Sequence, residues 1–228
     1  MVLHNDEIFM QASNPFCGYN IPVVTYRYAD HQNLNADLVS IIDDLENFYV
    51  TTKSDSIKND DGNTQTKSIL THNYNNFNIF DRTEYESIGK FKAFVADCYR
   101  HYIEKYTKFE CKNIVLSAWG NKLGRYDFLN RHCHVYEINN LLEISANYFV
   151  KSPGHKTFTR YYSPLSIIKE YYLYRENNEG DFTIFPSFVE HDTSANRSFD
   201  KYRYTLGMDA FHADENLDAH KCLIQLID

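Results

Sequence analysis

The sequence predicts an α+β fold in which two helices brace a set of β-strands. In the N-terminal half, two stretches repeat apolar residues at helical spacing, whereas from about residue 112 the chain changes to short apolar runs. Gly, Asn, Asp and Pro separate most of those runs. The 19 Tyr and 16 Phe also favour strands, because aromatic side chains pack well on pleated surfaces. We expect a β-sandwich or barrel with the helices on one face.

The first 68 residues are expected to hold a lead-in, a strand, a helix and a loop. Residues 1–20 show no regular pattern, and residues 21–28 form a short apolar run. Asn35 is the predicted N-cap of a helix whose apolar residues are Leu38, Ile41, Ile42, Leu45 and Phe48. Residues 51–68 are almost entirely polar, which predicts a loop.

A second helix has the clearest pattern in the sequence. Thr83 and Glu86 have the spacing of a capping box, in which two side chains satisfy backbone N–H groups at the start of a helix. The buried stripe of this helix is predicted to consist of Ile88, Phe91, Val95, Cys98, Tyr102 and Ile103. We interpret this stripe as core that packs against a sheet.

The C-terminal half contains eight candidate strands. Their predicted ranges are 113–119, 132–138, 141–150, 156–162, 169–175, 181–186, 202–211 and 221–227. The length of 228 residues fits one domain. That domain, residues 1–228, would have helical support over about residues 1–111 and a β core over about residues 112–228.

Composition argues against several classes of protein. The formal net charge of −8 is unlike that of a protein that follows a nucleic-acid backbone, whose surface is usually basic. No apolar run reaches the roughly 18 residues that a membrane helix needs, and the first ten residues lack the features of a signal peptide. Five cysteines without a C-x-x-C pair indicate reduced thiols. We therefore expect a soluble, cytoplasmic protein that binds neither membranes nor nucleic acid.

Three histidines form a candidate metal site. On a strand over residues 132–138, His132 and His134 point to the same face, with Cys133 opposite. His191 follows a second apolar run, in a predicted loop of the kind that often carries site residues. Two ligands from one strand and a third from a neighbouring strand leave open positions on a metal ion. Neutral imidazole suits iron, zinc, copper and nickel alike, so the histidines alone do not choose the metal.

A candidate anion-binding pair lies further along the chain. Arg203 is expected on a strand, with Thr205 on the same face. The fork of an arginine and the hydroxyl of a threonine can together bind a carboxylate. A surface ion pair is the alternative interpretation of Arg203. With the histidines, this pair predicts a metal site beside an anion-binding cation.

The order of these motifs resembles a family of 2-oxoglutarate- and iron(II)-dependent oxygenases that is common in bacteria and phages and similar to the prolyl hydroxylases. The residues that carry the resemblance are Trp119-x-Asn121, Gly124-x-Tyr126, His132-x-His134, Ser145-x-x-Tyr148-Phe149-Val150, Gly180-Asp181-x-x-x-Phe185-Pro186-Ser187, His191, Asn196 and Arg203-x-Thr205. The resemblance covers most of residues 20–211 and is most specific over residues 180–205.

The resemblance implies a double-stranded β-helix, or jelly-roll, core with Fe(II) as the cofactor. His132 and His191 would be iron ligands, and Arg203, helped by Thr205, would bind the distal carboxylate of the co-substrate 2-oxoglutarate. Tyr148 is a further candidate contact to this co-substrate. The implied reaction consumes O2 and 2-oxoglutarate and releases succinate and CO2. It usually hydroxylates a substrate, here a small molecule, an amino acid or a peptide.

The second metal ligand departs from the pattern of the family. A carboxylate usually stands two residues after the first histidine, and this position holds His134. We predict a site of three histidines, His132, His134 and His191. Glu137 and Glu143 are alternatives that would supply an oxygen ligand instead.

Most other motif residues are expected to have structural roles. Trp119 is expected to pack in the core or to wall the pocket, and Asn121 and Asn196 to form turns or to line the site. Asp192 is expected to be exposed or to orient an imidazole, and Cys133 to be a small core residue. Two further functions are alternatives: a cupin-like metal-binding or structural protein without turnover, such as a phage accessory protein, and a metal enzyme that does not use 2-oxoglutarate.

Overall fold

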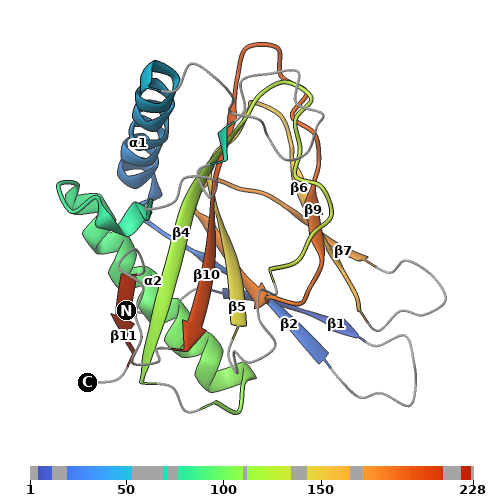
Figure 1. Ribbon diagram of the computed structural model, residues 1–228. Coiled ribbons are helices and arrows are strands. Elements are labelled where there is room, and N and C mark those ends of the chain that lie inside the picture. The colour runs from blue at the N-terminus through green and yellow to red at the C-terminus, as the bar shows by residue number, and fades with distance from the viewer. Residues whose placement is uncertain are drawn as a thin grey trace.

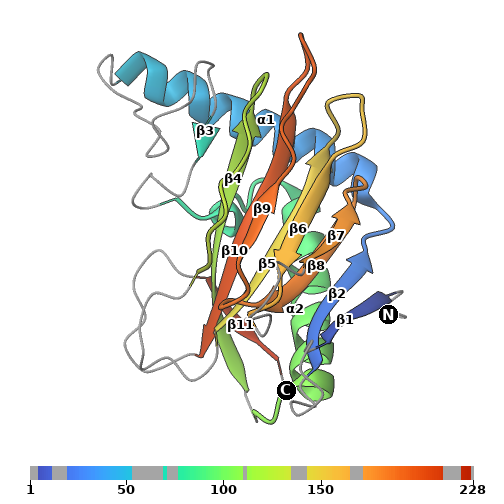
Figure 2. The same ribbon diagram turned by 90° about the vertical axis from the view of Figure 1, so that its right-hand side faces the viewer.

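Two β-sheets face each other, and two helices cover the outer face of the larger sheet (Figure 1). Figure 2 shows the same layers after a quarter turn, with the smaller sheet toward the viewer and the helices behind. The computed structural model describes residues 5–11, 20–52, 69–70, 77–109, 112–134, 143–164, 172–212 and 222–226. The predicted α+β class, with helices on one face of a β-sandwich, is confirmed.

In the described part of the chain, the larger sheet has eight strands, and all of their pairings are antiparallel. In spatial order it contains β1 (Asn5–Gln11), β2 (Asn20–Arg27), β8 (Asp181–Pro186), β5 (Glu143–Lys151), β10 (Arg203–His212), β4 (Asn113–Leu123) and β11 (Cys222–Gln225), and β3 (Ile69–Leu70) pairs with β4. The smaller sheet has the order β7 (Tyr172–Glu176), β6 (Phe158–Tyr162), β9 (His191–Thr193). Strand β10 therefore lies inside the larger sheet, paired with β5 on one side and β4 on the other.

Helices α1 (His31–Thr52) and α2 (Glu86–Tyr106) bury their apolar stripes against the larger sheet, and a short 3-10 helix, η2 (Ile79–Asp81), precedes α2. Every predicted residue of the α2 stripe is buried: Ile88, Phe91, Val95, Cys98, Tyr102 and Ile103. Phe91 has no exposed surface, and its ring lies 4.7 Å from that of Tyr148 on β5. The core between helices and sheet is thus predictable from helical periodicity.

Both predicted helix starts are wrong in detail. Helix α1 begins at His31, and Asn35 lies inside it with 7% of its surface exposed. The Asn35 side chain donates to the carbonyl of Val150 at 2.6 Å and accepts from the hydroxyl of Tyr148 at 2.8 Å. Asn35 therefore ties the helix to β5 instead of capping it.

At the second helix, the N-cap is Tyr85, and no side chain caps it by a hydrogen bond. The predicted capping box of Thr83 and Glu86 does not form, because α2 begins at Glu86 itself. The helix is positioned by the burial of its apolar stripe, which outweighs local capping signals.

The N-terminal segment contributes more to the sheet than predicted. Part of the expected irregular lead-in, residues 1–20, forms strand β1, which pairs with β2 at the edge of the larger sheet. Division into helical support before about residue 112 and a β core after it is therefore too simple. The predicted loop over residues 51–68 overlaps the end of α1 at Thr52, and residues 53–68 lie outside the described residues. Within the described part of the chain, neither helix is long and apolar enough to span a membrane.

The packing of Phe91 generates a test of this core. Replacing Phe91 with Ala should lower the free energy of unfolding by about 3–5 kcal/mol, because the substitution leaves a cavity among closely packed rings. Urea unfolding followed by circular dichroism measures this change. Phe199→Ala is the matched control, since Phe199 is 79% exposed and its loss should cost about 0.5 kcal/mol. Equal losses for both variants would contradict the assignment of the core.

Candidate metal centre

Backbone pairing places His132 beside His191. The two residues form an isolated antiparallel bridge in which each N–H donates to the other residue's carbonyl, with N–O distances of 3.1 and 2.8 Å. His191 begins strand β9, where a loop was predicted. The N–H of His134 donates to the carbonyl of Ser187 at 3.0 Å. Among residues 131–134 only His132 pairs in this way, so the strand predicted over residues 132–138 is wrong there; residues 135–142 lie outside the described residues.

The three imidazoles converge although the expected strand is missing. Their candidate ligand atoms all lie within 4.8 Å of one another. Ring centroids are 4.4 Å apart for His132 and His191, 5.0 Å for His132 and His134, and 5.1 Å for His134 and His191. Three imidazole nitrogens on one side of an ion, each about 2.1 Å from it, would be roughly 3.0–3.4 Å apart. The three rings therefore lie near one another but would have to move closer together to share one cation.

All three imidazoles have Nδ1 next to an oxygen acceptor. The Nδ1 atoms of His132 and His191 lie 2.5 and 3.1 Å from the carbonyl oxygens of Asn130 and Val189. Nδ1 of His134 lies 2.7 Å from a carboxylate oxygen of Asp209. We assign the proton to Nδ1 in each ring on the basis of these acceptors, which leaves the lone pair on Nε2. This is the arrangement found in metal-binding histidines, whose second nitrogen is held by an outer partner.

Electrostatics keeps His191 neutral. Burial lowers the pKa of His191 well below its usual value of 6.5, and the neighbouring His132 and His134 lower it further. A neutral imidazole is the form that coordinates a metal ion. His191 is therefore ready to act as a ligand at neutral pH.

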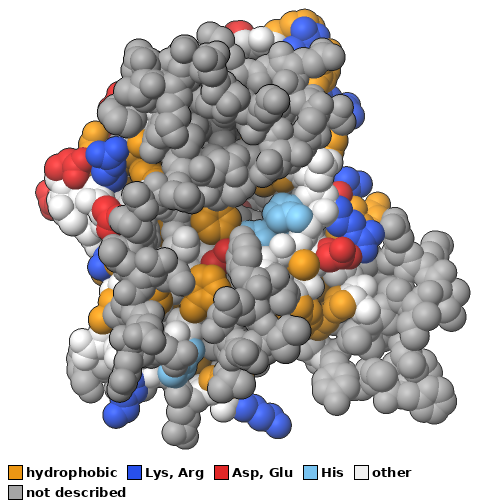
Figure 3. Space-filling view, viewed as in Figure 1, with side chains coloured by type: hydrophobic (Ala, Val, Ile, Leu, Met, Phe, Trp, Pro, Cys, Tyr) orange, Lys and Arg blue, Asp and Glu red, His pale blue; other side chains and the backbone are white. Residues whose placement is uncertain are grey.

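A cavity of about 120 Å³ joins the histidines to Arg203. Figure 3 shows histidine side chains, in pale blue, in a hollow on the face that is turned to the viewer. The residues that line the cavity are Trp119, Asn121, Leu129, His132, His134, Ala146, Asn147, Phe149, Thr159, Asn177, His191, Thr193, Arg203, Thr205, Leu206 and Gly207. The structure therefore brings all three histidines together with Arg203 and Thr205.

Arg203 is fully buried and still carries its charge. Its guanidinium donates to the carbonyl of Ser194 at 2.8 Å and to the hydroxyl of Thr193 at 2.7 Å, while Nε is buried without a partner. Burial lowers the pKa of Arg203 to about 10, and the carboxylate of Asp127 partly opposes this shift. The alternative of a surface ion pair is wrong. In the same cavity, the amide of Asn121 donates to the hydroxyl of Thr205 at 3.2 Å.

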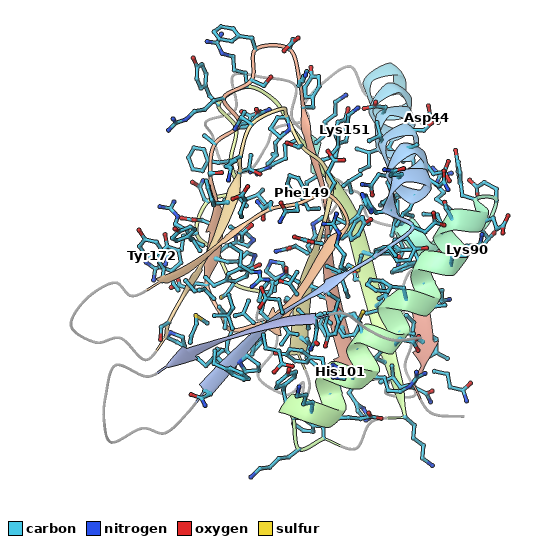
Figure 4. All side chains as sticks on the ribbon, turned by 180° about the vertical axis from the view of Figure 1, so that it is seen from behind. Asp44, Lys90, His101, Phe149, Lys151 and Tyr172 are labelled. Atoms are coloured by element: carbon cyan, nitrogen blue, oxygen red, sulfur yellow. The ribbon has the colours of Figure 1, made fainter. Side chains whose placement is uncertain are left out.

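Tyr148 must be removed from the predicted co-substrate residues. Its hydroxyl donates to Asn35 on α1, and its ring packs on Phe91 of α2, so it lies in the core between helices and sheet. Side chains alternate along β5, and the neighbours Asn147 and Phe149 line the cavity instead. In Figure 4, Phe149 lies between the two sheets, away from the helices.

Neither Trp119 nor Cys133, two residues near the histidines, is a core residue. Trp119 walls the cavity, with its indole centroid 5.6 Å from the ring of His134. Gly207, opposite Trp119 on β10, makes room for this ring, because a Cβ at Gly207 would lie 2.5 Å from it. Cys133 is exposed, so the prediction of a small core residue is wrong. The reason is that His132 and His134 lie in an irregular segment without a buried opposite face.

Asp192 and Asn196 have structural roles. Asp192 is buried in the sheet, where its carboxylate accepts two hydrogen bonds from Arg160 and one from Tyr162. It is neither exposed nor bonded to an imidazole, so both expectations for it are wrong. Asn196 does not line the cavity; its side-chain oxygen accepts the N–H of Ser198 at 2.9 Å, as in the expected Asx-turn, and its amide donates to the carbonyls of Leu123 and Lys201.

The alternative carboxylate ligands stay untested. Glu137 lies outside the described residues, and the side chain of Glu143, at the start of β5, is not among those described.

Sequence reasoning missed the acidic partner of His134. Asp209 is 2% exposed and lies on the same strand and face as Arg203, six residues later. The spacing could have predicted Asp209 as a site residue, because odd-numbered residues of β10, such as Arg203, Thr205 and Asp209, share one face of the strand. Thr193, which holds Arg203, was missed because β9 has only three residues.

Three comparisons with known proteins place this fold. No family model matches the chain, and no curated protein matches it. Solved structures do: EctD from S. alaskensis with 2-oxoglutarate and 5-hydroxyectoine has a TM-score of 0.56 at 11% identity, over 86% of this chain and 74% of that one. A Trichoplax adhaerens prolyl hydroxylase in complex with a peptide fragment of hypoxia inducible factor has a TM-score of 0.55 at 9% identity, over 83% of each chain.

The carbocyclase SnoK from nogalamycin biosynthesis, described as non-heme and alpha-ketoglutarate-dependent, has a TM-score of 0.54 at 9% identity, over 84% of this chain and 80% of that one. The chain therefore has the double-stranded β-helix fold of 2-oxoglutarate/Fe(II) oxygenases, as the sequence resemblance implied. At these identities the likeness concerns the fold alone.

Trp119 provides a direct test of the metal centre, because it is the only tryptophan in the chain. Paramagnetic Co(II) bound at the three histidines should quench its fluorescence saturably, since the indole packs beside His134. His191→Ala should weaken Co(II) binding by at least about tenfold, as loss of a ligand is worse than loss of an outer partner. The matched control is His212→Ala, an exposed histidine at the end of β10, which should bind Co(II) like the unmodified protein. Quenching that survives in His191→Ala would contradict this site.

Proposed function

We propose that the protein is an Fe(II)- and 2-oxoglutarate-dependent oxygenase formed by residues 1–228 as one domain. The observation that carries the proposal is the convergence of three imidazoles and one buried arginine on a single cavity. Fold likeness to oxygenases supports it. In this proposal His132, His134 and His191 hold the iron, and Arg203 holds the co-substrate.

The residues present fit a bound iron(II). Three nitrogen ligands on one side leave the opposite positions open for a co-substrate and for O2. Iron bound there would supply the activation of O2 that is coupled to decarboxylation of 2-oxoglutarate. The neutral state of His191 and the acceptors at each Nδ1 favour ligation through Nε2.

Arg203 fits the distal carboxylate of 2-oxoglutarate. Among the described cavity-lining residues it is the only Lys or Arg, and it is a buried cation whose hydrogen-bond partners are neutral groups. The carboxylate of Asp127 offsets only part of the cost of burying this charge, and the carboxylate of a co-substrate would offset more of it. The hydroxyl of Thr205 lies on the same strand face and can donate to the same carboxylate.

The prime substrate is a small molecule, an amino acid or a peptide, and the reaction releases succinate and CO2. The structural neighbours include one complex with a peptide and one with a small molecule, so both classes fit this fold. Asn147, Thr159 and Asn177 line the cavity as uncharged polar groups and would contact bound molecules by hydrogen bonds. We place the protein in the cytoplasm.

Co-substrate binding has a measurable consequence for stability. At 100 times its Kd, 2-oxoglutarate should stabilise the metal-loaded protein by about 2.7 kcal/mol, which corresponds to roughly 5–10 °C in Tm for a chain of this size. Arg203→Met should lose most of this shift. Tyr148→Phe, which removes a hydroxyl on the helix side of the sheet, should retain it. A shift that persists in Arg203→Met would contradict the assigned role.

The pKa of Arg203 predicts how this binding depends on pH. The protonated guanidinium binds the carboxylate, and its pKa is lowered to about 10. Affinity for 2-oxoglutarate should therefore be constant between about pH 7 and 9 and fall as the pH rises through 10 and above. Isothermal titration of the Co(II)-loaded protein measures this. An affinity that rises with pH in the alkaline range would contradict the model.

Succinate formation separates the proposal from its alternatives. Under air, the Fe(II)-loaded protein should convert 2-oxoglutarate to succinate, and it should do so slowly when no prime substrate is present. The His191→Ala variant should form no succinate. Metal binding without succinate and without a 2-oxoglutarate shift would favour the cupin-like binding protein. Zinc in the purified protein, with activity that iron does not restore, would favour a metal enzyme of another kind.

A further inference from the structure

The outer partner of His134 differs from those of the other two candidate ligands. His132 and His191 have backbone carbonyls at Nδ1, whereas His134 has the carboxylate of Asp209 at 2.7 Å. Asp209 is only 2% exposed and His134 only 6%. A carboxylate binds an imidazole N–H more strongly than a carbonyl does, and more so in a buried site. The three imidazoles are therefore not electronically equivalent.

A closed set of hydrogen bonds fixes both residues. The same oxygen of Asp209 accepts from the hydroxyl of Ser145 at 2.7 Å, and Ser145 is bonded to the hydroxyl of Ser187 at 2.9 Å. The carbonyl of Ser187 in turn accepts the backbone N–H of His134. His134 is thus held at its backbone and at its side chain by one buried network. The network ties the segment of His134 to three other parts of the chain: β5, β10 and the segment that follows β8.

The negative charge of Asp209 also favours a cation at the proposed metal position. Within the described residues, its one ion-pair partner is the imidazole of His134, and no Lys or Arg pairs with it. An anion removed from water is costly unless a positive charge lies nearby. A dication on the other nitrogen of His134 would supply that charge through the ring.

Mononuclear iron oxygenase sites commonly combine two histidines with one carboxylate on the metal. We infer that Asp209 is a positioning residue of the metal centre, which supplies through His134 the negative charge that such sites place directly on the metal. This inference rests on the proposed metal site. In it, Asp209 holds His134 with Nε2 toward the ion and makes that imidazole a stronger ligand.

The test compares two buried aspartates that lie close to the histidines. Asp209→Asn keeps the shape and one acceptor oxygen but removes the charge, and Co(II) affinity should fall about 10–100-fold. Asp192→Asn is the matched control: Asp192 is 7% exposed and follows His191, but it bonds Arg160 and Tyr162 rather than an imidazole. Its Co(II) affinity should stay within about threefold of the unmodified protein, since no ligand loses its partner. Affinity is read from Trp119 quenching and from the d–d absorption of Co(II), which should also shift in Asp209→Asn.

A second readout separates positioning from general stability. Without metal, Asp209→Asn should have a Tm equal to or above that of the unmodified protein, because the substitution removes a buried charge. Ser145→Ala, which keeps the charge and loses one of the two bonds to it, should lower Co(II) affinity by a smaller factor.

Unchanged Co(II) affinity in Asp209→Asn would overturn the inference. Parallel losses of metal-free Tm and of affinity in both aspartate variants would also overturn it, since they would indicate a structural role. If the unmodified protein binds no Co(II), the metal centre itself fails. If it binds Co(II) but not 2-oxoglutarate, the proposed function fails and the role of Asp209 stands.

Discussion

Strand β10 connects the two chemical ends of the cavity. It is paired with β4 along its whole length and with β5 from Tyr204 to Phe211, so neighbours on both sides fix its position. Because side chains alternate, its cavity face presents Arg203, Thr205, Gly207 and Asp209 in order. The candidate co-substrate cation and the orienting carboxylate thus lie on one rigid element. Changing the register of this strand by one residue would move both to the helix side.

The alternation of side chains along β10 places core residues on one face of the strand and residues of the candidate site on the other. The opposite face of β10 carries Leu206, Met208 and Ala210, which pack in the helix-covered core. That core contains most of the buried apolar side chains and supports a cavity rich in polar groups. The polar interior is costly by itself, as the desolvated Arg203 and Asp209 illustrate. Large apolar burial on one face of the sheet therefore permits a polar site on the other.

Periodicity predicted the regular parts of the molecule. The α2 stripe and the alternation on β10 follow from local sequence, since each repeats with the period of its element, and strand β8 is a short apolar run next to turn residues. Helix starts failed at Asn35 and Thr83 because tertiary packing, not capping, fixes where those helices begin. Strands β1 and β9 were missed because an edge strand is defined by its pairing partner rather than by its own residues. His132 and His134 were expected on one strand, and they meet instead through two different backbone contacts, with His191 and Ser187.

The sequence by itself determined the class of fold, the identity of the three histidines and the arginine, and the order in which they follow one another. Those properties depend on residue type and on spacing within a single element. Only the tertiary structure decided that Tyr148 faces the helices, that Trp119 walls the cavity and that Asp209 stands behind His134. Each of these depends on which face of a strand meets which neighbour, and that is settled by sheet register between residues far apart in the chain.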